Sequence, residues 1–384
     1  MRTAFIYSHE FERFTYSPSH PLKPIRFKLT YELTKAYGLL DLPDTRVVQS
    51  VPCSEADIAT VHSIEYIEAV KHGAERFAEW DLISYGLGTA ENPLPPKVYE
   101  WSLLGVGASL QAAKLVASGE AAIAFNMAGG QHHASRNRAS GFCYFNDVSV
   151  VIRYFLDQGY RVAYIDIDAH HGDGVQEMFY RTNQVLKISL HESGLYLFPG
   201  SGFEREMGVG EGAGYSVNIP LLPQADDDIF WYAFHEIVPP LLDCFKPDVL
   251  VTQLGVDTFE ADPLTTLSMT TQGYSQVIQE LKRLSPGKWV AFGGGGYDVL
   301  QVPRAWTLAW AIMNEIELPD KLPDQYCALI HHLGSHDGYL RDKPYQTSNT
   351  IKRRILKELE KTLAYIKEHQ LKMICSQSGG LIDK

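Results

Sequence analysis

The stretch VAYIDIDAHHGDG, residues 162–174, decides how the rest of the chain is interpreted. It opens with four apolar residues, typical of a buried strand, and then places Asp166 and Asp168 where the strand ends. Side chains two positions apart on a strand point to the same face, so the two carboxylates lie together. Burying them side by side is costly unless something positive lies between them. With His170 close behind, the residue types predict a divalent metal of the zinc or iron kind; the alternative is an exposed Asp/His loop.

The composition is that of a globular protein with an acidic balance. The chain has 384 residues, 45% of them hydrophobic and 21% charged, and a formal net charge of -12. This balance argues against direct nucleic-acid binding, which needs clustered Lys and Arg, and favours a cationic substrate. There is no run of 18 or more apolar residues, so no membrane span is predicted. Oligomeric state is not indicated by any pattern.

Cysteine usage and the first residues predict a cytoplasmic protein. The five cysteines are scattered without a CxxC pair, which favours reduced thiols over a disulfide framework. The first residues, MRTAFIYSHEFERF, lack the apolar core and small-residue cleavage site of a signal peptide.

Predicted strands alternate with predicted helices along most of the chain. The strands are expected at residues 3–7, 45–51, 121–125, 162–165, 185–190, 248–253 and 289–292. The helices are expected at residues 25–40, 55–61, 64–80, 98–118, 148–158, 229–245, 271–284 and 303–316. Such alternation predicts an α/β fold with a mainly parallel sheet sandwiched by helices. Residues 318–344 are expected to be irregular, and residues 351–373 to form an amphipathic helix docked on the domain or, alternatively, a subunit contact.

Polar residues follow four of these strands at the point where each strand ends. They are His132 and His133, then Asp166, Asp168 and His170, then Asp257, and finally Tyr297 after four consecutive glycines. Open α/β sheets bind their ligands at the carboxyl ends of the strands. The glycines lack the Lys-Ser/Thr ending of a phosphate loop, so a close backbone approach that aims Tyr297 is predicted.

These residues assemble into a hydrolytic site. Asp168, His170 and Asp257 supply three metal ligands and leave a position for water, which a metal activates as a nucleophile. One of the two histidines can move the proton, and Tyr297 can donate a hydrogen bond to the developing oxyanion. The set suits hydrolysis of an amide or ester.

Several segments also resemble a known family. GGQHHASRNRASGFCYFND, YIDIDAHHGDGVQEMF, SLH, FPGSG, GVDTFEADPL and GGGGY occur in the order and spacing of the zinc-dependent histone deacetylase superfamily. The match resembles its bacterial branch, the acetoin utilization proteins. The resemblance implies an arginase/deacetylase-like single domain with an eight-stranded sheet, and removal of acetyl groups from lysine or acetylated polyamines. It covers roughly residues 1–320, the catalytic domain, and leaves 321–384 as a C-terminal extension.

The resemblance implies roles for individual residues. Zn2+, or Fe2+ in its place, would be held by Asp168, His170 and Asp257. His132 would pair with Asp166 and His133 with Asp173, with His133 as general base and acid. The substrate tunnel would be lined by Gly141, Phe142 and Phe198, with Leu264 and Glu91 at its rim. A structural potassium ion would bind Asp166, Asp168, His170, Ser189 and Leu190. A second would bind Phe179, Thr182, Val185 and Tyr215. Arg26 would line an exit channel for acetate.

Two positions depart from the family pattern. Glu91 stands where Asp is common at the rim, and Leu197 stands where many relatives carry a second aromatic.

Three other functions compete with protein lysine deacetylation. Arginase chemistry needs two manganese ions, but Asp257 is followed by Thr258 and Phe259 rather than by a second carboxylate ligand. An acetylpolyamine amidohydrolase would use the same catalytic set, and the acidic balance suits its substrate. A non-catalytic acetyl-lysine-binding scaffold predicts loss of Tyr297 or of a histidine, and none is lost.

Overall fold

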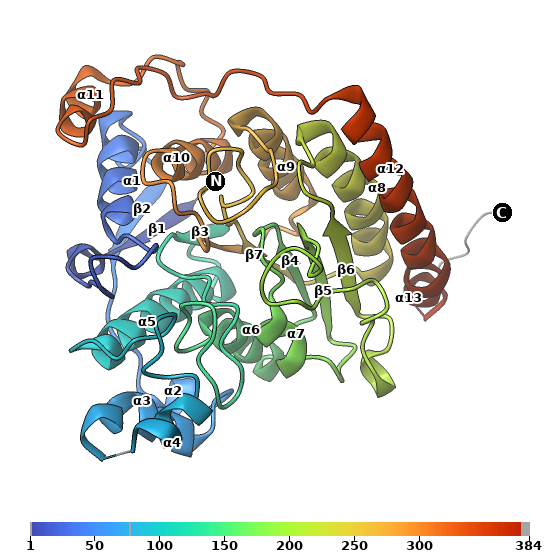
Figure 1. Ribbon diagram of the computed structural model, residues 1–384, viewed down its shortest axis with the longest axis horizontal. Coiled ribbons are helices and arrows are strands. Elements are labelled where there is room, and N and C mark those ends of the chain that lie inside the picture. The colour runs from blue at the N-terminus through green and yellow to red at the C-terminus, as the bar shows by residue number, and fades with distance from the viewer. Residues whose placement is uncertain (1, 77, 378–384) are drawn as a thin grey trace.

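A computed structural model describes residues 2–76 and 78–377, and among these residues eight strands form one sheet (Figure 1). The strands are β1 (Thr3–Tyr7), β2 (Thr45–Gln49), β3 (Ile123–Asn126), β4 (Val162–Asp166), β5 (Val185–Glu192), β6 (Ser216–Leu221), β7 (Val249–Gln253) and β8 (Trp289–Phe292). Their order is β2-β1-β3-β8-β7-β4-β5-β6, and every pairing is parallel. The predicted single-domain α/β fold is confirmed.

Helices cover both faces of the sheet, as Figure 1 shows. One face carries α1 (Ile25–Ala36), α8 (Asp227–Phe245), α9 (Thr271–Leu284) and α10 (Gln301–Met313). The other carries α5 (Val98–Ala117), α6 (Asp147–Asp157) and α7 (Asp173–Met178), with the short α2 (Glu55–Ile58), α3 (Ile64–Arg76) and α4 (Glu79–Ser84) beyond α5. The last helices are α11 (Asp324–His331), α12 (Asn349–Ile366) and α13 (Lys372–Gln377), with a π-helical turn, Lys367–Leu371, between the last two.

The core lies on both sides of the central strands, which explains their nearly continuous apolar sequences. Every residue of β3, β4, β7 and β8 is buried. On one side Trp306 and Trp310 of α10 fill the layer: the Trp310 ring lies 5.2 Å from that of Phe5, and the Trp306 ring 6.4 Å from that of Phe125. The packing of these large aromatic side chains thus holds α10 against strands β1 and β3.

Several elements differ from the sequence prediction, and one of them is α7, which was not predicted. The helix expected over residues 64–80 ends at Arg76, and α4 begins at Glu79; residue 77 lies outside the described residues. Strand β6, SVNIPL, was not predicted, because Asn218 and Pro220 interrupt its apolar run; it is an edge strand that α12 covers. Helix α11 lies in the stretch expected to be irregular, where Tyr326 and Ile330 are buried four residues apart.

The expectation of reduced thiols is wrong for one pair of cysteines. Cys244 of α8 and Cys375 of α13 form a disulfide, with their Cα atoms 4.8 Å apart. They are 131 residues apart in the chain and meet only because α13 packs against α8, which no local spacing reveals. Cys53, Cys143 and Cys327 are free thiols.

The C-terminal helices lie against the sheet edge and α8 (Figure 1). The face that α12 turns inward carries the buried side chains Ile355, Leu359, Leu363 and Ile366. The division of the chain at residue 320 stays a prediction. Within residues 2–76 and 78–377, every helix is too short or too polar to span a bilayer.

Candidate active site

The sheet order explains why the predicted site residues meet. Strands β3, β8, β7 and β4 are consecutive neighbours in the sheet, and all four run in the same direction. The segments that leave their carboxyl ends carry, in this order, the two histidines, Tyr297, Asp257, and the Asp168 and His170 pair. Four stretches far apart in sequence are therefore adjacent at one edge of the sheet, as expected for parallel α/β architecture.

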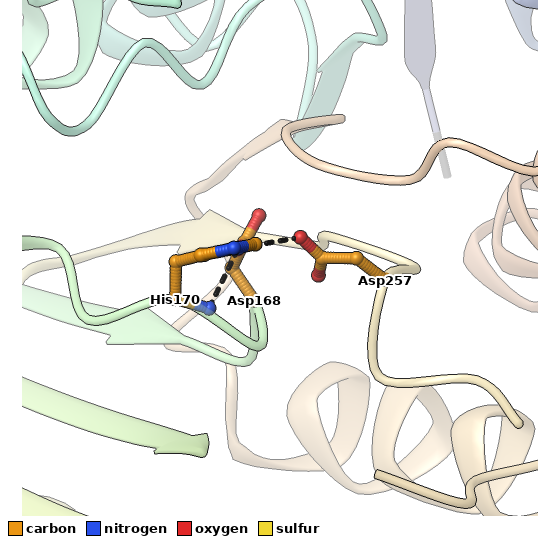
Figure 2. Close-up of side chains that lie close together, drawn as sticks. All are labelled: Asp168, His170 and Asp257. Atoms are coloured by element: carbon orange, nitrogen blue, oxygen red, sulfur yellow. Dashed lines mark hydrogen bonds and ion pairs between the residues drawn. The ribbon is translucent and has the colours of Figure 1, made fainter. Parts of the chain in front are cut away.

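Asp168, His170 and Asp257 form a buried cluster of ligand atoms that all lie within 4.8 Å of one another (Figure 2). The His170 Nδ1 atom is 3.2 Å from Asp168 Oδ1 and 2.9 Å from Asp257 Oδ2. Burial raises the pKa of Asp257 to about 6, with the neighbouring charge of Asp168 adding to the effect. Two buried carboxylates that share one imidazole fit a divalent cation, which would neutralise both.

The glycine turns leave no room for side chains beside these carboxylates. The Gly295 main-chain N–H donates to Asp168 Oδ2 at 2.7 Å. A Cβ atom on Gly295 would lie 2.2 Å from Asp257 Oδ2, and one on Gly255 would lie 2.2 Å from Asp168 Oδ2. The four consecutive glycines therefore permit the close backbone approach that the sequence predicted, and the phosphate-loop alternative has no support here.

The two histidines are each held by a separate carboxylate. The Nδ1 of His132 donates to Asp166 at 2.8 Å and the Nδ1 of His133 donates to Asp173 at 2.7 Å. The two Nε2 atoms are 3.0 Å apart.

The surroundings of the two rings push their pKa values in opposite directions. Burial opposes the charged form of both rings. The carboxylates of Asp166 and Asp168 outweigh burial at His132 and raise its pKa to about 9. At His133 burial and the neighbouring His132 dominate and lower the pKa to about 4. The arrangement favours a charged His132 beside a neutral His133.

Two supporting residues escaped the sequence analysis. Asp147 accepts the main-chain N–H groups of Gly130 and Gln131 at 3.0 and 2.7 Å, which fixes the loop that carries the histidines. The Tyr164 hydroxyl donates to Asp166 Oδ2 at 2.6 Å. Tyr164 lies two residues before Asp166 on the same strand face, a spacing that could have revealed it. For Asp147, 16 residues after Gln131, no local pattern exists.

Hydrogen bonding of its main chain fixes the position of Tyr297. Its N–H donates to Asp262 Oδ2 at 2.8 Å, while Asp262 Oδ1 accepts the N–H of Leu264 at 2.9 Å. The Tyr297 ring lies 6.4 Å from that of His170, and burial raises the pKa of its hydroxyl well above the ordinary value. The hydroxyl therefore stays protonated, as a hydrogen-bond donor must. Asp262 is a further supporting residue that the sequence analysis missed.

Three of the predicted tunnel residues contact His133 or Tyr297. The Phe198 ring lies 5.0 Å from His133 and the Phe142 ring 5.8 Å from Tyr297. A Cβ atom on Gly141, where φ is +53°, would lie 2.2 Å from His133 Cδ2, so its backbone packs directly on that ring. Phe198 is 41% exposed and Leu264, predicted at the tunnel rim, is 38% exposed.

Phe142, one of the predicted tunnel residues, is braced by the N-terminal loop. The Tyr16 hydroxyl donates to the Phe142 carbonyl at 2.9 Å, and the His20 ring packs edge-on against Phe142 at 4.5 Å. Glu91, predicted at the rim, accepts the main-chain N–H of Gly141. Residues 10–24 hold Pro18, Pro21 and Pro24, and nothing local in this stretch links it to the predicted tunnel.

Arg26 contacts the main chain next to Tyr297. It is buried, its Nη1 donates to the Gly296 carbonyl at 2.8 Å, and its Nε has no hydrogen-bond partner among the described residues. An unpartnered buried N–H next to the site fits the predicted contact with a departing anion.

The two predicted monovalent cation sites differ in their surroundings. The five residues of the first are buried, and Asp166 and Ser189 are register partners on β4 and β5. At the second, the Lys187 Nζ donates to the carbonyl oxygens of Phe179 at 2.7 Å and Val185 at 3.1 Å. An ammonium group thus already contacts two of the four residues predicted there.

Comparison with known proteins identifies the family. A histone deacetylase domain model matches residues 20–313. The chain belongs to the histone deacetylase family. Its relatives include the acetoin utilization protein AcuC of Bacillus subtilis strain 168, 42% identical over 331 residues, which are 84% of this chain and 85% of the relative. AcuC of Staphylococcus aureus strain MRSA252 is 38% identical over 313 residues, 80% of each chain.

A solved structure of the histone deacetylase family has the same fold. The crystal structure of a histone deacetylase homolog from Aquifex aeolicus superposes with a TM-score of 0.86 at 32% identity, covering 96% of this chain and 100% of the homolog. A structure of a histone deacetylase homolog complexed with SAHA gives a TM-score of 0.87 at the same identity and coverage. The resemblance to the bacterial acetoin utilization branch of the family is confirmed.

Proposed function

We propose that the chain is a metal-dependent amidohydrolase that removes acetyl groups from lysine side chains of proteins. One observation carries the proposal. The buried Asp168, His170 and Asp257 cluster lies beside two histidines with separate carboxylate partners, and the His133 and His170 rings are 5.9 Å apart. Family membership supports the acetyl-removing class of reaction.

The chain's own residues divide the chemistry between them. A divalent cation bound at the cluster supplies Lewis acidity toward a water molecule and the acetyl carbonyl. His133, neutral and oriented by Asp173, accepts the proton of the attacking water at Nε2 and later delivers it to the leaving amine. His132, held charged by Asp166, orients the water and stabilises negative charge. Tyr297 donates its hydroxyl hydrogen to the oxyanion.

The proposal extends to the ions and the cellular role. Zn2+ is the proposed ion and Fe2+ the alternative, because both accept two carboxylates and one imidazole. Potassium is proposed at the first monovalent site. The AcuC relatives, named as acetoin utilization proteins, support a role in acetoin use. Control of acetyl-CoA synthetase is also proposed, and it rests on the family resemblance alone. A cytoplasmic location is proposed as well, but the disulfide between Cys244 and Cys375 removes the reduced-thiol pattern from its support.

The deciding test compares kcat/KM for an acetyl-lysine peptide and for acetylspermidine, with the full chain loaded with one zinc ion. Strong preference for the peptide supports the proposal. Strong preference for the polyamine favours the second candidate, an acetylpolyamine amidohydrolase. The net charge of -12 supports this candidate, because an acidic protein attracts a cationic substrate. Turnover of neither substrate, with metal bound, contradicts both and leaves a binding scaffold or another acyl group.

A further inference from the structure

Lys187 of β5 is a buried lysine without a carboxylate partner. It is 5% exposed, and within residues 2–76 and 78–377 no carboxylate forms an ion pair with it. Lysine is rarely buried this deeply unless it is paired, since removing an ammonium group from water is unfavourable. The partners of the Lys187 ammonium group are instead two main-chain carbonyl oxygens, those of Phe179 and Val185.

The Phe179 carbonyl belongs to the residue that caps the end of α7. The carboxyl end of a helix carries partial negative charge and unsatisfied carbonyl groups, which a lysine ammonium stabilises. The first residue of the same helix is Asp173, whose carboxylate holds His133. Lys187 therefore fixes one end of a short helix whose other end orients a histidine of the candidate active site.

The C-terminal helices close the surroundings of Lys187. The Tyr215 carbonyl accepts the main-chain N–H of Lys187 at 2.9 Å, and the Tyr215 hydroxyl donates to Gln377 Oε1 at 2.7 Å. The Gln370 side chain donates to the Ser216 carbonyl at 2.5 Å. The strand β6, which pairs with β5 beside Lys187, is thus covered by the C-terminal helices.

We propose that Lys187 is a built-in cation, whose ammonium group takes the place of the second monovalent ion and holds the end of α7. The ammonium has the charge of potassium and already contacts the Phe179 and Val185 carbonyls, so a second cation there would meet a like charge at short range. These residues therefore do not fit a second ion while Lys187 is present. The chain needs one monovalent ion where the resemblance predicts two.

Crystals of the wild-type full chain soaked in thallium(I), a heavy substitute for potassium, test the proposal directly. We expect no anomalous peak in contact with the Phe179 and Val185 carbonyl oxygens. Lys187→Ala keeps both carbonyls and opens the space, so a thallium peak is expected at the former Nζ position. A wild-type peak that touches both carbonyls overturns the proposal, and this part of the test needs no variant.

Thermal unfolding gives an independent measurement. In tetramethylammonium chloride, Lys187→Ala and Lys187→Met should each unfold about 5 °C or more below wild type. Potassium chloride at equal ionic strength should restore part of the loss in Lys187→Ala but not in Lys187→Met, whose side chain fills the space without charge. Lys282→Ala is the matched control, because the Lys282 Nζ also donates to a helix-end carbonyl, that of Ile312, yet pairs with Glu315. Variants as stable as wild type without potassium would overturn the proposal, whatever the enzyme's substrate.

Discussion

The carboxylate of Asp262 accepts the main-chain N–H of Tyr297, with 2.8 Å between Oδ2 and the nitrogen. The same carboxylate accepts the N–H of Leu264, so one buried side chain connects the proposed oxyanion donor to a residue of the predicted tunnel rim. Asp262 is therefore a positioning residue that acts through Tyr297. Its loss should alter the direction of the tyrosine and not its chemistry.

Asp262→Asn should lower kcat about 10- to 100-fold while KM changes little, because a donor displaced by a fraction of an ångström loses most of its effect. Steady-state kinetics measure both constants, and thermal unfolding checks that the fold persists. Asp298→Asn is the control, because Asp298 accepts two nearby main-chain N–H groups, of Leu300 and Gln301, without touching that of Tyr297. An unchanged kcat in Asp262→Asn would contradict the role.

Tyr297→Phe should retain fold and bound metal and lose roughly 100-fold or more in kcat, since it removes a single hydrogen bond that strengthens in the transition state. Metal content by mass spectrometry and kcat on an acetyl-lysine peptide are the two measurements. Full turnover with normal metal content would remove Tyr297 from the mechanism.

Removal of the divalent metal should abolish turnover and lower the unfolding temperature. Asp168 and Asp257 are buried next to each other, and without a cation their charges repel in a region of low dielectric. Dialysis against a chelator, followed by titration with Zn2+ or, without oxygen, Fe2+, measures recovery of both properties. A chelated protein that keeps its activity would contradict the proposed metal dependence.

Acid should destabilise the protein partly through His62, which is buried away from the site. The Asn146 main-chain N–H donates to its Nε2 at 2.9 Å, and burial lowers its pKa to about 4 from an ordinary 6.5. The unfolded chain therefore binds a proton between these values that the folded chain does not. The stability that the neutral ring contributes is complete above pH 6.5 and is lost as the pH falls to 4, by about 1.4 kcal/mol per pH unit.

His62→Gln should reduce the slope of unfolding free energy against pH by about that amount between pH 4 and 6.5. Denaturant unfolding at several pH values measures the slope. Equal slopes in wild type and His62→Gln would show that His62 is not the group that binds the proton.

The fold and the ligand residues were accessible from the sequence for a physical reason. Each ligand stands directly after an apolar strand, and parallel strands must deliver their carboxyl ends to one edge. Asp147, Asp262 and His20 were not accessible, because each acts on a loop that lies far from it in the chain and is brought near only by folding.

Lys187 is a residue whose surroundings could not be predicted from the sequence. In the run VLKISL a lysine suggests an exposed position, yet the side chain lies beneath the end of α7. A single charged residue within an apolar strand does not reveal which carbonyl groups it will meet.

The bond between Cys244 and Cys375 gives the last helices a second attachment to the body of the protein. The connection from α11 to α12, residues 332–348, includes the exposed side chains of Leu333 and Tyr339. A protease that cuts this connection would leave both pieces joined through sulfur, as one molecule under non-reducing electrophoresis. A reductant would then separate a fragment that carries α12 and α13. Nicking alone therefore does not uncover the strand edge that α12 protects.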